Sequence, residues 1–102
     1  MTTDDRFPDL EGVMRDRNLP IDKRLEASAN LLNASRSRAV ALLLELAQDE
    51  HEEEALARQV GALVGRISFE DGDVDGVPLH DFSESAYLGF DEEVGKMERG
   101  ES

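Results

Sequence analysis

The residues whose spacing most resembles a chemical motif are three aspartates on alternate positions and the glycine after them: Asp71, Asp73, Asp75 and Gly76. An EF-hand calcium loop has oxygen ligands at its first, third and fifth positions, glycine at the sixth and a bidentate acid at the twelfth. Counted from Asp71, the twelfth residue is Phe82, so two ligand oxygens are missing. We therefore predict no metal site. A calcium-responsive loop completed by Asp81 or Glu84 is kept as an alternative.

No other pattern predicts catalysis. His51 is followed by three glutamates, but Ala55 stands where an HExxH zinc motif needs its second histidine. His80 beside Asp81 is a single base in an expected loop. The chain has no cysteine, which excludes a thiolate nucleophile and a cysteine-ligated zinc. We also find no phosphate loop, GxSxG or cofactor motif, so we predict a protein that is not an enzyme and needs no cofactor.

Charge is the most unusual property of the chain. Its formal net charge is −13, from 24 acids and 11 Lys and Arg. Residues 67–102 hold 11 of the acids and 2 of the bases. Such a surface repels nucleic acid and anionic lipid and attracts cationic proteins. We expect a basic protein partner, no nucleic acid and no membrane. The acidic start, the absence of a long apolar run and the lack of cysteine favour a soluble, cytoplasmic protein.

The spacing of apolar residues predicts an all-α fold of four to five short helices. The first two are expected over about residues 8–17 and 20–33. The third, RAVALLLELAQ, follows Ser35 or Ser37 as N-cap and has almost no polar face, so we expect it to be covered from more than one side. The acidic run at residues 49–54 is expected to open the fourth helix, EEALARQVGALVGRI, because acids complement a helix N-terminus.

The second and fourth helices share an apolar pattern offset by 35 positions, a period typical of helical repeats. The matched pairs are Ile21 with Leu56, Leu25 with Val60, Ser28 with Leu63, Ala29 with Val64 and Leu32 with Ile67. The segments KRLEASANLL and LARQVGALVGRI resemble the HEAT and phycobilisome-lyase-type repeats over residues 19–67. Those families favour an Arg, small residues and a Leu-Gly, here Arg58, Gly61, Ala62 and Gly65; the first copy departs at Leu31 and Leu32.

That resemblance implies an antiparallel stack of helices that binds proteins and shares no catalytic residue. Gly61 and Gly65 are expected to let a neighbouring helix approach closely. After the repeat, residues 68–81 are predicted to form an acidic loop. A short fifth helix follows, limited by Gly89 and Gly95, and its aromatic residues are expected to cap the stack. We predict one domain over residues 1–95, with a repeat core (19–67), an acidic loop and capping segment (68–95) and a disordered tail (96–102).

In size, charge and architecture the chain resembles the immunity proteins that bacteria make against toxins. The resemblance implies an acidic surface that occludes a cationic toxin domain, such as a nuclease. The predicted partner-binding residues are Phe69, Asp71, Asp73, Asp75, Asp81, Glu84, Tyr87, Phe90, Asp91, Glu92 and Glu93. The alternative is an adaptor repeat whose acidity only keeps it soluble. In that case a set of arginines matters more: Arg15, Arg17, Arg36 and Arg38.

Overall fold

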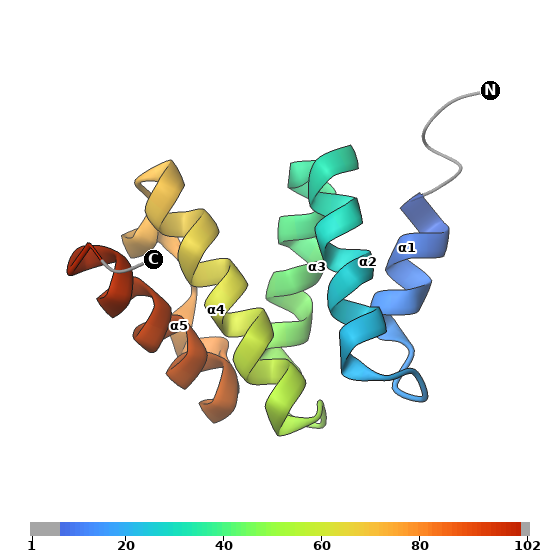
Figure 1. Cartoon of the computed structure of the whole chain (residues 1–102). Coiled ribbons are helices and arrows are strands. Elements are labelled where there is room, and N and C mark those ends of the chain that lie inside the picture. The colour runs from blue at the N-terminus through green and yellow to red at the C-terminus, as the bar shows by residue number, and fades with distance from the viewer. Residues whose placement is uncertain (1–6, 101–102) are drawn as a thin grey trace. The chain divides into compact units, whose positions relative to one another are not determined.

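The computed structural model describes residues 7–100. Within this range the chain forms five α-helices and no β-strand, which confirms the all-α prediction. The helices are α1 (Phe7–Arg15), α2 (Ile21–Ala34), α3 (Arg36–Gln48), α4 (Glu54–Asp71) and α5 (Glu84–Glu98), shown in Figure 1. Two short 3-10 turns, η2 (Val74–Gly76) and η3 (Leu79–Asp81), lie between α4 and α5.

The chain divides into two compact units where the sequence predicted one domain. The N-terminal unit is Met1–Leu42 and the C-terminal unit is Leu43–Ser102, so the division falls inside α3. In the N-terminal unit α1 packs against α2, and in the C-terminal unit α4 packs against α5 (Figure 1). Each unit therefore has a helix pair of its own.

A buried arginine holds α1 and α2 together. Arg24 is only 2% exposed, and its Nε donates a hydrogen bond of 2.9 Å to the backbone oxygen of Met14. Met14 lies in the last turn of α1, where carbonyl groups lack partners within the helix. A cation is also favourable at this end of the helix dipole. The side chain of Arg24 therefore satisfies the end of one helix from the buried face of the next.

The buried face of α2 differs from the predicted stripe. The residues buried on α2 are Arg24, Ala27, Ser28 and Leu31. Ile21, Leu25 and Leu32 are half-buried and Ala29 is exposed, whereas their counterparts 35 positions later in α4 are buried. Arg24 lies on the buried face of α2, where its guanidinium donates a hydrogen bond to the backbone oxygen of Met14. The structure does not confirm the predicted repeat.

One broad face of α3 is buried. Its buried residues are Ala39, Leu42, Leu43, Leu46 and Ala47. Ala41 and Glu45 are exposed on the opposite side, so one side of this helix remains uncovered. The helix begins directly after Ser35, the first of the two N-cap candidates.

Glycines bring α4 and α5 into direct backbone contact. A Cβ at Gly61 would lie 1.9 Å from the backbone oxygen of Ala86, and one at Gly89 would lie 1.9 Å from that of Arg58. At Gly65 the nearest atom would be the backbone oxygen of Phe90, at 3.1 Å. Since no side chain fits at Gly61 or Gly89, the two helices can approach only because both residues are glycine. The close approach predicted from Gly61 and Gly65 is confirmed.

The same contact explains why α5 is longer than predicted. It spans 15 residues and passes through both Gly89 and Gly95, which were expected to keep it short. Packing against α4 outweighs the low helix propensity of glycine, which is about 1 kcal/mol per residue. Residues 96–98, expected in a disordered tail, belong to α5. Residues 101–102 lie outside the described part of the chain.

Candidate protein-binding surface

The start of α5 is fixed by Ser83. Its side-chain oxygen accepts a hydrogen bond from the backbone N–H of Ala86, and its own N–H donates to the backbone oxygen of Ala47, at 2.8 Å. The first bond caps the N-terminus of α5, as serine commonly does. The second ties this terminus to the end of α3 within the C-terminal unit. The position of α5 is therefore defined at its N-cap residue and along its glycine contact.

Two of the predicted surface aromatics differ sharply in exposure. Phe90 is 3% exposed and packs edge-to-face on Phe82, with ring centroids 6.1 Å apart. The ring of Phe90 therefore belongs to the core beneath α5 and offers no surface to a partner. Phe69 is half-buried in the last turns of α4. Tyr87 is 45% exposed.

The outer face of α5 carries an exposed apolar pair. Among the side chains described, those of residues 9–100, Tyr87 and Leu88 are the large hydrophobic ones that remain exposed, at 45% and 44%. Leu88 was not among the predicted residues. The signal was present in the sequence, because the positions of Ala86 and Phe90 define the inner face of the helix and leave Leu88 outside it.

The carboxylates along α5 fall into two groups. Glu92 forms an ion pair with Arg58 of α4, and Glu93 forms one with Arg66 at 3.0 Å. Glu84 and Asp91 are exposed, and within the described chain neither has an ion-pair partner. Of the predicted acids on α5, two therefore help to hold the helix in place and two keep an uncompensated charge.

The alternating aspartates lie around the end of α4. Asp71 is its last residue, and Gly72 then takes a left-handed conformation, with φ of 72°. The N–H of Gly72 donates to the oxygen of Phe69 and the N–H of Asp73 to that of Ser68, a Schellman arrangement that terminates the helix. The first residues of the DGDVDG stretch therefore serve to close a helix.

The other loop acids follow this helix end. Asp73 precedes η2, Asp75 lies within it and Asp81 lies in η3, and all three are exposed. Residues 7–100 contain no group of three or more His, Cys, Asp or Glu placed to hold a metal ion. The loop between α4 and α5 thus presents carboxylates to solvent as separate charges.

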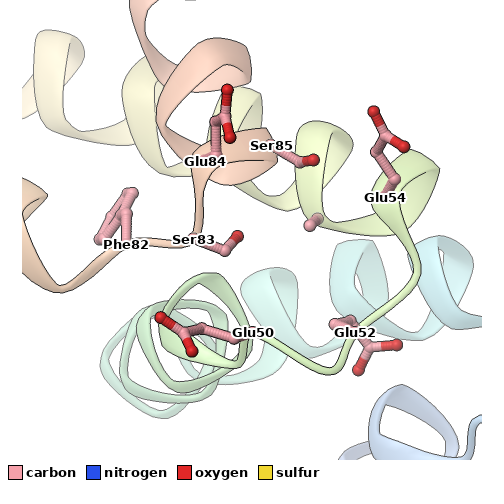
Figure 2. Close-up of a pocket in the computed structure, with 8 residues that line it drawn as sticks. Glu50, Glu52, Glu54, Phe82, Ser83, Glu84 and Ser85 are labelled. Carbon is pink, nitrogen blue, oxygen red and sulfur yellow. The ribbon is translucent and has the colours of Figure 1, made fainter.

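A pocket of about 360 Å³ in the C-terminal unit gathers further carboxylates (Figure 2). Its lining residues are Glu50, Glu52, Glu54, Ala57, Phe82, Ser83, Glu84 and Ser85. Only Glu84 was predicted as a site residue. The acidic run was expected to open a helix, but α4 begins at Glu54, so Glu50 and Glu52 lie in the connection before it. Glu84 links this pocket to the outer face of α5.

The net charge is confined to one unit. Residues 1–42 contain 7 acids and 7 Lys and Arg, whereas residues 43–102 contain 17 acids and 4 Lys and Arg. The first unit is therefore formally neutral and the second carries the entire −13. A concentration of charge of one sign raises the rate at which an oppositely charged partner associates.

No protein family, curated protein or solved structure matches this chain. Between residues 7 and 100, none of the helices combines the length and the apolar character needed to span a bilayer.

Proposed function

We propose that this chain is a protein-binding module of the cytoplasm whose C-terminal unit binds and occludes a basic protein. The proposal rests above all on the confinement of the whole net charge of −13 to residues 43–102. By analogy with immunity proteins, the partner is a cationic toxin domain, and binding covers the surface that the toxin needs for its activity. No chemical step on the partner is required.

Two kinds of surface residue divide the work of binding. Exposed carboxylates on the loop and on α5 accelerate encounter with a cationic surface, and this acceleration falls as salt screens the charges. Exposed apolar residues, Tyr87 above all, lose water on contact and slow dissociation. Removing one carboxylate should therefore lower the association rate, and removing the tyrosine ring should raise the dissociation rate.

The test compares two variants with the same change in net charge. In the first, three exposed acids of the loop are reversed: Asp73→Lys, Asp75→Lys and Asp81→Lys. In the control, three exposed acids of the N-terminal unit are reversed: Asp9→Lys, Asp22→Lys and Glu26→Lys. Each variant and the unchanged chain are immobilised, and proteins retained from a lysate of the source cell are identified by mass spectrometry.

We expect the unchanged chain and the control to retain the same basic protein, and the loop variant to lose it. Expression of that protein alone should arrest growth, and co-expression with the chain should restore it. Equal retention by all three proteins would contradict the role of the acidic unit. Retention without an effect on growth would leave the binding module in place and remove the immunity function.

An adaptor function is the second candidate, and one observation favours it. The N-terminal unit has a mainly apolar groove of about 430 Å³ between α1 and α2. Its lining residues are Leu10, Val13, Leu19, Pro20, Lys23, Glu26, Ala27 and Asn30. An adaptor that binds a peptide in this groove would tolerate charge reversal in the loop, so the loop variant separates the two functions. Substitution of Val13 by Asp would then abolish retention.

A further inference from the structure

We infer that the outer face of α5 docks an amphipathic basic helix of the partner. The apolar stripe of that helix would cover Tyr87 and Leu88, and its Lys or Arg residues would meet Glu84 and Asp91. This inference rests on the proposed function, because it names the part of a basic protein that the C-terminal unit recognises.

The four residues share one side of the helix. Glu84, Tyr87, Leu88 and Asp91 follow the spacing i, i+3, i+4 and i+7, which places side chains on a common helical face. The opposite side of α5 is occupied, since Gly89 contacts the backbone of α4. The apolar pair is therefore flanked by a carboxylate one turn before it and another one turn after it.

The charges around Tyr87 and Leu88 indicate which kind of partner would bind there. Glu92 and Glu93 are already neutralised by arginines of α4, whereas Glu84 and Asp91 are exposed and have no ion-pair partner in the described chain. A partner that buries Tyr87 and Leu88 must also approach these two carboxylates. If the partner has cationic side chains on both sides of its apolar stripe, they attract Glu84 and Asp91 and offset the cost of desolvating these carboxylates. Recognition of an amphipathic helix through i, i+3, i+4 and i+7 anchors is a common binding mode.

Other occupants fit less well. In a second copy of this chain, the same face would bring carboxylates towards carboxylates. An anionic membrane or a nucleic acid would be repelled by the net charge of the C-terminal unit. The apolar groove of the N-terminal unit, by contrast, has both Lys23 and Glu26 on its lining, so its charges select no class of occupant.

The test uses the full chain and two synthetic peptides made of Lys, Leu and Ala in identical amounts. In the amphipathic peptide, leucines fall at helical spacing with lysines one turn to either side. In the isomer, the same leucines are scattered around the helix. Both are fluorescently labelled, and binding is followed by anisotropy at several salt concentrations. We expect the amphipathic peptide to bind about tenfold more tightly, as for a buried apolar anchor.

Two variants and one control locate the contact. Tyr87→Ala with Leu88→Ala should abolish the preference for the amphipathic peptide and leave binding of the isomer unchanged. Glu84→Gln with Asp91→Asn should weaken the amphipathic peptide and flatten its salt dependence. The control removes two exposed acids away from α5, Glu53→Gln and Glu70→Gln, and should retain the preference. Circular dichroism should show equal helix content in all four proteins.

Equal affinity for the two peptides, or a preference that survives the loss of Tyr87 and Leu88, overturns the docking site. Either result would remove the anchoring role of Tyr87 but would leave open whether the acidic unit binds a basic protein, which is tested separately by capture with the loop variant. Sedimentation of the unchanged chain as a dimer that dissociates on Tyr87→Ala also overturns the inference, since a second copy would then occupy the face.

Discussion

Each of the two units pairs two short helices, but the contacts that hold the two pairs together differ in kind. In the N-terminal unit a buried cation, Arg24, reaches from α2 to a backbone oxygen at the end of α1. In the C-terminal unit α4 and α5 meet backbone to backbone at Gly61 and Gly89. The first unit is formally neutral and the second carries the whole net charge. At its closest points the contact between α4 and α5 uses backbone atoms, and the exposed side chains of α5 remain available for binding.

The glycine contact should be the most sensitive point of the molecule. Gly61→Ala or Gly89→Ala places a methyl group against a backbone oxygen that cannot move without its helix. We expect a loss of about 3 kcal/mol or more in the free energy of unfolding, since overpacking of this kind reaches the upper end of its usual range. Chemical denaturation followed by circular dichroism measures it. A loss below about 1 kcal/mol would mean that α4 and α5 separate easily.

The buried arginine should rank second. Arg24→Met keeps an apolar side chain of similar length but leaves the oxygen of Met14 without its donor. We expect a loss of about 2 kcal/mol, the usual value for a hydrogen bond to a charged group. Native-state hydrogen exchange should show the loss in α1 and α2. If the variant is as stable as the unchanged chain, packing rather than hydrogen bonding holds the N-terminal unit together.

A third substitution separates close contact from helix propensity. Gly12 lies in α1, and a Cβ added there would meet no atom within 4 Å, unlike one at Gly61. Gly12→Ala should stabilise the protein by about 0.5–1 kcal/mol, because alanine loses less conformational freedom in a helix. The same denaturation experiment serves as a direct contrast with Gly61→Ala. Destabilisation at both positions would indicate that glycine is needed for a reason other than contact.

The smallest effects are expected for surface ion pairs, of which one from each unit can be compared. Arg38 donates to both carboxylate oxygens of Glu11, whereas both donors of Arg66 meet a single oxygen of Glu93. Double-mutant cycles should give coupling free energies of about 0.5 kcal/mol, slightly larger for the bidentate pair. A coupling above about 2 kcal/mol for Arg66 with Glu93 would show that ion pairs, and not glycine contacts, fix α5.

The sequence predicted the features that depend on local spacing. Apolar periodicity located all five helices, and the Gly61 and Gly65 pair indicated a close helix approach. It missed the inward turn of Arg24, because a pattern of apolar residues cannot show which polar side chain will find a buried acceptor. The sequence also predicted too short an α5. The low helix propensity of Gly89 can be read locally, but the contact with Arg58 that overrides it involves a residue far away in the chain.

The candidate surface was predicted only in part. Its acids and Tyr87 could be named from charge and residue type. Leu88 and the burial of Phe90 depend on which side of α5 meets α4. The acidic pocket depends on two separated segments, residues 50–57 and 82–85, coming together. The boundary between the two units falls between Leu42 and Leu43, within an apolar run of α3 in which no residue type marks a division.

Because α4 and α5 meet at Gly61 and Gly89, the residues that hold α5 in place differ from the residues proposed to contact a partner. Gly61, Gly89 and Phe90 can stay constant while Glu84, Tyr87, Leu88 and Asp91 change, since no atom of the second set takes part in the closest helix contact. Substitutions on the outer face of α5 can therefore change which partner binds without disturbing the contact that stabilises the fold. That independence makes α5 a practical place to engineer new binding specificity.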